Sequence, residues 1–399
     1  MLHPNLQNRG KLINMKRWGN LWHKVVDFDN LLTAYQKAKK GKSHRDEVAL
    51  FSLNLEKALF TLQMHLTQGV YRPSEYRLFT IYDRKPRLIA AAPFRDRVVH
   101  HAVMNIIEPL LDRRFIDDCY ACRSGKGVHA AVDRYQYYAQ RYTYVLKLDI
   151  QKYFPSIVHQ QLKLMLRRRL KDVDLLLLLD RIIDSSPCYA SELKKFTEKV
   201  DKDADNIRRG IPIGNLTSQF FANLYLDEFD HWLKETCKVK GYIRYVDDLF
   251  IFADNKNELW RRLGDTQNYL STIGLLIHPA KIKLVPSRLK VDVLGYQLSP
   301  DRRWLRNDNG YRMRRKLLCM AQGFALGKLD WDDIHPSMRS WIGHAQHGET
   351  NGLRKAMFSP VQFKREQVND PPCETGRFLE QQTEEYALGQ PQQEYRDKP

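Results

Sequence analysis

The sequence contains no long apolar run. Across its 399 residues the longest purely aliphatic stretch covers positions 175–179, whereas about 20 apolar residues are needed to cross a bilayer as a helix. Positions 1–5 lack the charged and then apolar order of a signal peptide. The six cysteines are too few and too scattered for the disulfide framework of a secreted protein. We therefore expect a cytoplasmic protein that has no membrane as a partner.

Motifs of several enzyme classes are also missing. The glycine-rich segment from Arg123 to Gly127 lacks the GxxxxGK spacing of a P-loop. No serine or cysteine stands in the sharp strand-to-helix turn that carries a hydrolase nucleophile. Cys119 and Cys122 have His129 nearby, but a structural zinc site normally needs a second ligand pair at similar spacing, and none follows. Reduced, partly buried thiols are the expected state of these cysteines.

Positive charge is present in excess. Lys and Arg number 65 against 47 Asp and Glu, so the formal net charge is +18. In a chain without a lipidation signal or membrane span, this excess indicates nucleic acid as the polyanionic partner. The length favours two or three subdomains. Segment 359–399 is polar and carries more acids than bases, and we expect it to form a flexible tail.

Hydrophobic periodicity predicts helices interrupted by a few strands. Apolar residues at three- and four-residue steps predict two helices between 29 and 69. Alternating patterns predict hairpins over 71–89 and 241–253. The remaining elements predicted from pattern are helices within 93–109, 160–209, 218–232 and 259–275, strands over 144–150 and 279–284, and a helix that opens at Arg312.

Three aspartates stand at the ends of predicted strands. Asp247 and Asp248 occupy the tip of the hairpin over 241–253, and Asp149 ends the strand over 144–150. Adjacent carboxylates repel one another, so a fold that holds them together needs a cation. Mg²⁺ prefers hard oxygen ligands, and a pair of metal ions needs several carboxylates to clamp the oxygens of a phosphoryl displacement. The three aspartates are therefore candidate metal ligands and catalytic residues.

The order of motifs around these acids resembles the palm motifs of reverse transcriptases. Asp149 is followed five residues later by Phe154, then by the glycine-bearing segment 210–219, by Tyr-Val-Asp-Asp at 245–248 and by Gly-Tyr at 295–296. The resemblance covers positions 72–358. Within that class, Ile-Gly-Asn-Leu-Thr-Ser-Gln at 213–219 and Ser-Trp-Ile-Gly-His-Ala at 340–345 are similar to the enzymes of diversity-generating retroelements.

This resemblance implies an α+β fold with the right-hand polymerase architecture. We expect fingers, a palm built from an antiparallel sheet backed by helices, and a helical thumb. The boundaries that we predict are a helical extension over 1–69, fingers over 70–142, palm over 143–298 with a helical insertion at about 160–209, thumb over 299–358 and the tail over 359–399.

The resemblance also assigns roles to single residues. Two Mg²⁺ ions, for which Mn²⁺ can substitute, are expected on Asp149, Asp247, Asp248 and the backbone of Ile150. Lys283 is expected to protonate the departing pyrophosphate, although a solvated edge-strand lysine shows the same alternation. The residues expected to bind the incoming dNTP are Lys85, Arg87, Phe154, Ile213, Gly214 and Gln219. Those expected to contact nucleic acid are Arg95, Arg97, Tyr245, Arg312, Arg314 and Arg315.

Two of these assignments have alternatives that the sequence leaves open. Lys85 and Arg87 lie in a basic hairpin that suits a triphosphate but is also typical of a solvated charged loop. Arg95 and Arg97 suit template phosphate, yet they can equally pair with acids inside the fingers, for which the candidates are Glu108, Asp112, Asp117 and Asp118.

The resulting prediction is a bacterial or phage-encoded RNA-directed DNA polymerase. An aromatic ring at Phe154 favours deoxynucleotides, because it would clash with a 2′-hydroxyl. Many reverse transcriptases carry a glutamine where Ile213 stands, and the loss of its hydrogen bonds predicts weaker discrimination. The resemblance to diversity-generating retroelements implies that the errors fall mainly at template adenines. Expected partners are a template RNA, the cDNA product, dNTPs and a small basic helical accessory protein. The alternatives are a reverse transcriptase of antiphage defence and a catalytically silent nucleic-acid-binding protein; a retron enzyme is disfavoured because its Val-Thr-Gly triplet is absent from the predicted thumb.

Overall fold

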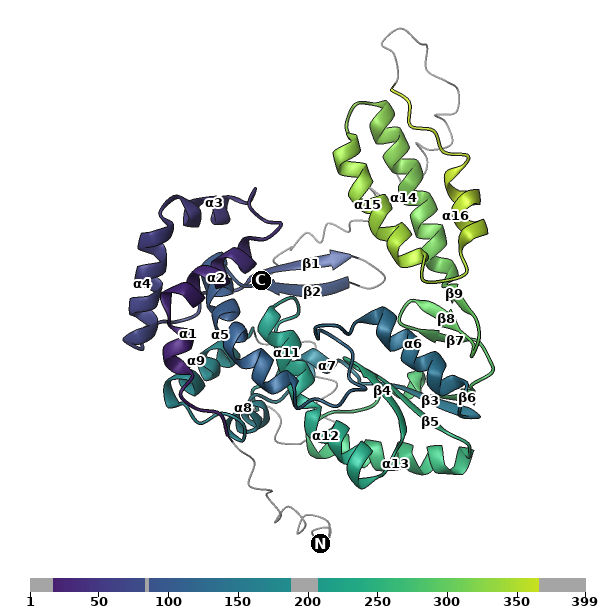
Figure 1. Cartoon of the computed structure of the whole chain (residues 1–399), viewed down its shortest axis with the longest axis horizontal. Coiled ribbons are helices and arrows are strands. Elements are labelled where there is room, and N and C mark those ends of the chain that lie inside the picture. The colour runs from purple at the N-terminus through teal and green to yellow at the C-terminus, as the bar shows by residue number, and fades with distance from the viewer. Residues whose placement is uncertain (1–16, 83–85, 188–206, 366–399) are drawn as a thin grey trace, which may run out of the picture. The chain divides into compact units, whose positions relative to one another are not determined.

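A computed structural model describes residues 17–82, 86–187 and 207–365 of the chain (Figure 1). The chain divides into two compact units, one formed by residues 1–294 and 298–302 and the other by residues 295–297 and 303–399. Both helices and antiparallel sheets are present, which confirms the α+β class. Within the described ranges, no helix is both long enough and apolar enough to cross a membrane.

A four-stranded antiparallel sheet forms the centre of the first unit. Its strand order is β4 (Gly241–Tyr245), β5 (Asp248–Ala253), β3 (Tyr144–Asp149) and β6 (Lys283–Pro286). The predicted hairpin over 241–253 and the predicted strand over 144–150 are thus confirmed. β3 lies between β5 and β6, and its first four residues pair with both strands. Its last residue, Asp149, pairs with β5 on one side, and its carbonyl accepts a hydrogen bond from the His278 amide (2.8 Å).

Helices cover both faces of this sheet, as Figure 1 shows. Side chains alternate along β5, so Phe250 and Phe252 lie on one face, where they pack against Tyr135 of α6 (Val128–Ala139). Leu249 and Ile251 point to the opposite face and join the main hydrophobic core. That side is covered by the helices α11 (Leu216–Tyr225), α12 (Asp227–His231), the π-helical turn Trp232–Thr236 and α13 (Lys256–Thr272).

The remaining helices of the first unit differ in part from the prediction. Three helices, and not two, lie between 28 and 67, because Asn54 leaves the helical conformation (φ −122°, ψ 46°) and separates α3 from α4. The predicted helix over 93–109 continues through Pro109 to Asp112. The elements are α1 (Trp22–Val25), α2 (Phe28–Lys39), α3 (Asp46–Leu53), α4 (Leu55–Thr67), α5 (Phe94–Asp112), α7 (Tyr153–Ser156), α8 (His159–Arg167) and α9 (Val173–Asp184).

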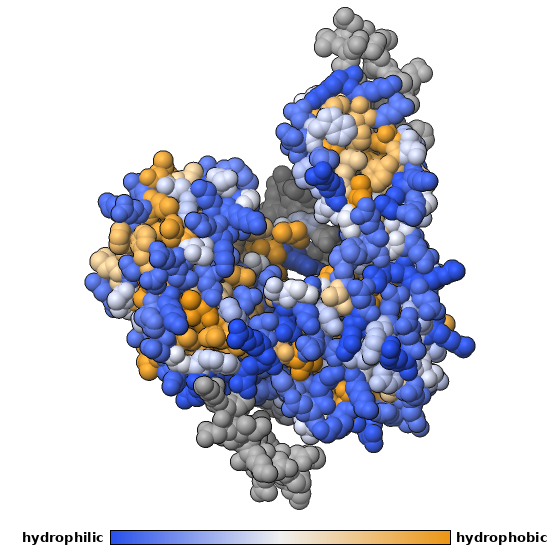
Figure 2. All heavy atoms as spheres, in the orientation of Figure 1, coloured by the Kyte–Doolittle hydropathy of each residue, from blue (hydrophilic) through white to orange (hydrophobic). Residues whose placement is uncertain are grey.

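Apolar side chains gather on the surface of α3 and α4. Leu50 and Leu53 of α3 and Phe60 and Met64 of α4 are each about half or more exposed. Figure 2 shows this apolar region on the viewed face.

Two further predictions are corrected by the structure. The strand predicted over 279–284 begins only at Lys283, because Pro279–Lys281 forms a 3₁₀ turn with Pro279 at its first position. The helix predicted over 218–232 is broken at Leu226 into α11 and α12. For the predicted helical segment 160–209, the structure describes α8 and α9, and positions 188–206 lie outside the described residues.

A second hairpin precedes α5. It pairs β1 (Arg77–Tyr82) with β2 (Pro86–Ala91) in antiparallel register, within the segment where the sequence predicts a hairpin. All six residues of β1 are exposed, whereas β2 becomes buried toward Ala90. This hairpin therefore presents one complete strand to solvent.

The second unit is mainly helical and has its own core. Its helices are α14 (Asn307–Ala325), α15 (Trp331–Ala345) and α16 (Asn351–Phe358). Met313, Leu317 and Phe324 of α14 pack with Ile334 and Met357 in a separate hydrophobic cluster. Three short strands lie along this part of the sequence: β7 (Val291–Val293), which belongs to the first unit, β8 (Tyr296–Leu298) and β9 (Arg303–Leu305).

Candidate active site

The fold brings the three predicted aspartates to one end of the four-stranded sheet. Asp149 is the last residue of β3 and Asp248 is the first of β5, and the two stand directly opposite each other in the strand register. Asp247 lies in the turn before β5, and its carbonyl accepts a hydrogen bond from the Ile150 amide (3.1 Å). Residues nearly 100 positions apart in sequence are therefore fixed beside one another by backbone pairing.

The turn that carries Asp247 is held by a buried arginine. Val246 has a left-handed backbone (φ +55°), which is unfavourable for a β-branched residue. The Arg244 guanidinium donates to the Val246 carbonyl (3.4 Å) and forms three hydrogen bonds of 2.7–2.9 Å with the carboxylate of Asp230. Tyr242 donates to the same carboxylate (2.7 Å). Arg244 and Asp230 are both fully buried, so this ion pair ties the turn to α12.

Mutual repulsion and burial act on the acids of the turn. Burial is the main cause that raises the pKa of Asp247 to about 7, and the charges of Asp248 and Asp149 add to it. Burial also raises the pKa of Asp248, while the nearby Lys147 opposes that rise. Buried carboxylates with raised pKa values are characteristic of functional sites, and a bound cation would favour their charged forms.

A lysine that the sequence analysis did not select contacts the site. Lys281 Nζ lies 2.6 Å from Asp149 Oδ2. Lys283, the predicted proton donor, is the first residue of β6, stands opposite Lys147 and is exposed. No local pattern marks Lys281, because it acts through the 3₁₀ turn at Pro279–Lys281, which the sequence analysis took for part of a strand.

The chemistry of the donors suits a hard cation, although the side chains are not gathered into a ligand cluster. Within the described part of the chain, no three His, Cys, Asp or Glu side chains are close enough together to hold a metal ion. Lys281 instead provides the positive charge beside Asp149. Three carboxylates at one sheet end, two of them with raised pKa values, are nevertheless the oxygen ligands that Mg²⁺ prefers.

The glycine-bearing segment runs next to Phe154. Lys152 adopts a left-handed backbone (φ +46°) and starts α7, and the Phe154 carbonyl accepts a hydrogen bond from the Ile211 amide (3.1 Å). A Cβ on Gly214 (φ +110°) would lie only 3.3 Å from Ile89 of β2. The segment is therefore close to both α7 and the exposed hairpin. Of the other residues predicted to bind dNTP, Ile213 is half-buried, Arg87 and Gln219 are exposed, and Lys85 lies outside the described residues.

The two arginines of α5 are engaged within the chain. Arg95 donates to Asp96 (3.1 Å), to the Arg72 carbonyl (2.8 Å) and to Ser74 (2.9 Å). Arg97 forms an ion pair with Glu47 of α3. The sequence left open whether these arginines contact template phosphate or pair with acids of the chain. In the structure they pair with acids of the chain, but with Asp96 and Glu47 and not with the four acids named as candidates. Three of those acids pair elsewhere, in the contacts Arg123–Asp112, Lys126–Asp117 and Arg134–Asp118.

The other predicted nucleic-acid contacts lie in different surroundings. Tyr245 ends β4 opposite Asp248 and is half-buried. In the second unit, α14 carries Arg312, Arg314 and Arg315 on its exposed surface. The Gly-Tyr motif at 295–296 and the motif at 340–345 contact each other within this unit. The Tyr296 hydroxyl lies 2.9 Å from His344 Nδ1 and donates to the His344 carbonyl (2.7 Å).

A protein-family model gives the decisive comparison. The model described as "Reverse transcriptase (RNA-dependent DNA polymerase)" matches residues 82–298, which is more than half of the chain and contains all three aspartates. The chain belongs to the reverse transcriptase family. Its members are nucleotidyltransferases that copy RNA into DNA, so the enzyme class predicted from the sequence is confirmed at the level of the family.

Two curated proteins are similar to parts of the chain. Protein YkfC of Escherichia coli is 26% identical over 181 residues, which are 44% of this chain and 45% of that protein. The "Putative COX1/OXI3 intron 2 protein" of Saccharomyces cerevisiae is 21% identical over an alignment of 384 residues that covers 78% of this chain and 43% of that protein. The chain thus spans less than half of the length of each of these relatives.

Proposed function

We propose that this chain is an active RNA-directed DNA polymerase that uses Asp149, Asp247 and Asp248 as its catalytic carboxylates. The observation that supports the proposal is the register of β3 and β5, which sets Asp149 opposite Asp248 and beside the turn that holds Asp247. Strand extension is an in-line attack of a primer 3′-hydroxyl on an α-phosphate, and it needs alignment and charge stabilisation but no covalent nucleophile.

In this proposal the three carboxylates and the Ile150 carbonyl would hold two Mg²⁺ ions, or Mn²⁺ in their place. Bound there, the ions neutralise charge that develops on the attacking and leaving oxygens. The chain's own residues do the remaining work. Arg244 holds the turn of Asp247, and Lys281 would compete with a cation for Asp149, because its ammonium contacts Oδ2 of that carboxylate.

The architecture and the substrate are part of the same proposal. We assign the four-stranded sheet with its helices to the palm, the β1–β2 hairpin with α5 to the fingers, and α14–α16 to the thumb. The ring of Phe154 would lie next to the sugar of the incoming nucleotide and disfavour a ribose 2′-hydroxyl. The substrates are therefore dNTPs, and the partners are a template RNA and its cDNA.

Primer extension on an RNA template tests the proposal. Asp248→Asn keeps the size of the side chain but removes a ligand charge, and we expect extension to fall by at least about a thousandfold. Asp254→Asn is a matched control, because Asp254 follows the other end of the same strand, β5, and we expect nearly unchanged extension. RNA binding should persist in both variants. Extension by Asp248→Asn at the rate of the unmodified chain would refute the assignment.

A finer proposal concerns fidelity. The motifs at 213–219 and 340–345 are similar to those of diversity-generating retroelements, so we propose a mutagenic copying role at template adenines, with a small basic helical accessory protein as partner. Ile213 offers no hydrogen bond to the nascent base pair, and a loss of about 1.4 kcal/mol in discrimination raises misincorporation tenfold.

Sequencing of cDNA from one RNA template tests this role. Ile213→Gln should reduce errors opposite adenine several-fold and should change errors opposite the other bases less. Ile211→Val, a conservative change in the same segment, is the control. Accurate copying of adenine by the unmodified chain, or an error spectrum that Ile213→Gln leaves unchanged, would contradict the proposal.

A further inference from the structure

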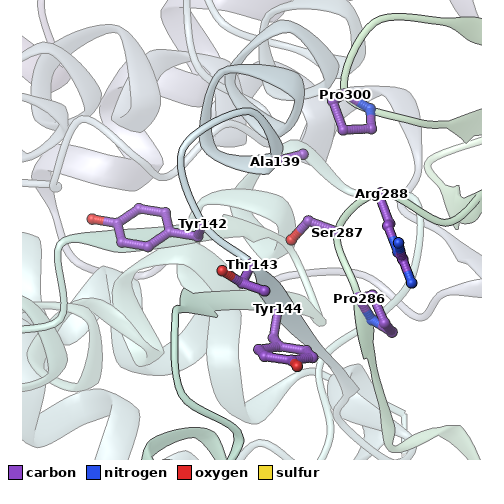
Figure 3. Close-up of a pocket in the computed structure, with 8 residues that line it drawn as sticks. All are labelled: Ala139, Tyr142, Thr143, Tyr144, Pro286, Ser287, Arg288 and Pro300. Carbon is purple, nitrogen blue, oxygen red and sulfur yellow. The ribbon is translucent and has the colours of Figure 1, made fainter.

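A second candidate site lies at the opposite end of the four-stranded sheet from the aspartates. A cavity of about 270 Å³ opens where α6 ends, β3 begins and the chain leaves β6 (Figure 3). Its walls combine the Tyr144 ring and two proline rings with the Ser287 hydroxyl and the Arg288 guanidinium. The Tyr142 ring points away from these groups and packs against Phe252 and Tyr138. The lining residues that matter here are Tyr142, Tyr144, Pro286, Ser287, Arg288 and Pro300.

The cavity contains a buried polar atom that lacks a partner. Ser287 is 2% exposed, and its amide donates to the Thr143 carbonyl (2.8 Å). Its side-chain oxygen, however, has no hydrogen-bond partner among the described residues. In Figure 3 this hydroxyl points toward the side of Tyr142 and Thr143. Because folded proteins rarely leave a buried polar atom unsatisfied, the hydroxyl indicates a ligand with a hydrogen-bonding edge.

The charges around the cavity favour an anionic ligand with a flat apolar part. Arg288 is exposed and provides a guanidinium, which suits phosphate. The Lys256 ammonium lies 5.2 Å from the centre of the Tyr144 ring, so it covers one face of that ring and adds a second cation. The nearby carboxylate of Asp254 already accepts hydrogen bonds from the amide and the hydroxyl of Thr143 (2.9 and 3.0 Å).

We propose that this cavity binds one unpaired nucleotide. The base would lie against the Tyr144 ring and the proline rings, the Ser287 hydroxyl would hydrogen-bond its edge, and Arg288 would pair with a flanking phosphate. The volume is below the roughly 300–1,000 Å³ typical of sites for larger small molecules, which suits a single base. Stacking on aromatic side chains, with arginine on the backbone, is the general means of holding unpaired strands.

The position excludes the reacting nucleotide as the ligand. Tyr144 and Asp149 are the two ends of β3, and five residues of strand span roughly 17 Å. The ligand is therefore either a base several nucleotides away along a bound strand or a free nucleotide. This inference goes beyond polymerisation, since binding at the cavity is measured without any extension step.

Photocrosslinking locates the ligand. A short uridine oligoribonucleotide that carries 5-iodouridine is irradiated with the full chain, and the crosslinked peptides are identified by mass spectrometry. We expect crosslinks within 142–144 or 286–288. Loss of these crosslinks when uridine monophosphate is added supports a free nucleotide, and loss only with unlabelled oligonucleotide supports a strand. Crosslinks confined to other parts of the chain would overturn the proposal.

Variants distinguish binding of the oligonucleotide at this cavity from its non-specific attraction to the basic surface of the protein. Arg288→Glu changes an exposed side chain, and Tyr144→Leu keeps an apolar residue in β3 but removes the ring. Each should weaken binding of the labelled oligonucleotide about three- to tenfold in an anisotropy titration. Arg261→Glu, an equal charge change on the exposed surface of α13, and Leu289→Ala, next to Arg288, should change it less than twofold. Equal weakening by Arg288→Glu and Arg261→Glu would refute the site.

Discussion

The first unit contains two antiparallel hairpins in opposite environments. In the β4–β5 hairpin, every residue is buried except the four half-buried ones at the tip, and the turn at Val246 is held by Arg244, which pairs with Asp230. In the β1–β2 hairpin, all of β1 is exposed, with Tyr82 at 82%. The same local topology therefore produces a fixed platform in one place and an accessible strand in the other.

The difference follows from what packs on each hairpin. Helices pack on the β4–β5 hairpin, so a polar group buried in it must find a partner inside the protein. Arg244 of β4 finds Asp230 of α12. The β1–β2 hairpin forms its own two-stranded sheet, so its side chains gain little from the core. The covered β4–β5 hairpin suits carboxylates that must keep fixed positions. The exposed β1–β2 hairpin suits groups that bind and release a substrate.

The strongest test of this comparison removes the buried arginine. Arg244→Met should destabilise the protein by about 3–5 kcal/mol, because it leaves the Asp230 carboxylate buried without its cation. Arg87→Met in the exposed hairpin should change the free energy of unfolding by less than about 0.5 kcal/mol. Urea unfolding measures both.

A double variant controls for the loss of volume and hydrogen bonds. Arg244→Met combined with Asp230→Leu removes the unpaired charge and should recover part of the stability lost in the single variant. Equal destabilisation by Arg244→Met and Arg87→Met would break the comparison between the two hairpins.

A second test concerns the helix that follows the exposed hairpin. His100 of α5 is fully buried, neither ring nitrogen has a partner among the described residues, and burial lowers its pKa to about 4, against the charge of Asp96. The unfolded chain binds a proton near pH 6.5, while the folded chain does not until about pH 4. Stability that is present above pH 6.5 is therefore lost as the pH falls toward 4, by up to about 3 kcal/mol.

Unfolding of His100→Leu between pH 7.5 and 4 checks this prediction. The stability of the unmodified chain should fall more steeply with acid than that of His100→Leu. His44→Leu, at an exposed histidine, should leave the slope unchanged. Parallel curves for the unmodified chain and His100→Leu would show that the buried neutral form of this histidine does not cause the loss of stability in acid.

The smallest expected effect is a change in Mg²⁺ affinity, which shows whether Lys281 or Lys283 acts at the aspartates. Lys281→Gln removes the cation that competes for Asp149, so Mg²⁺ should bind the protein several-fold more tightly in a calorimetric titration. Lys283→Gln, two residues away and exposed, should change Mg²⁺ affinity less than twofold. A larger effect of Lys283→Gln on metal affinity would contradict the claim that Lys281 competes with Mg²⁺ for Asp149.

The sequence predicted the parts of the site that depend on local pattern. The strands that carry the three aspartates, the hairpin at 71–89 and most helices follow from periodicity and turn residues, and the structure confirms them. Errors arose where one residue interrupts a regular pattern. Asn54 divides a predicted helix, Leu226 ends another, and Pro279 converts the start of a predicted strand into a 3₁₀ turn.

The partners of charged groups were decided by the tertiary structure alone. The amino-acid order determined that one acid ends a strand, that two more stand at the tip of a hairpin, and that the chain is strongly basic, because these properties are local or compositional. It did not determine that Lys281 contacts Asp149 across 132 positions or that Arg97 pairs with Glu47. A charge pairs with whichever opposite charge the packing of distant elements brings near, so its partner is a property of the folded chain and not of its neighbours in sequence.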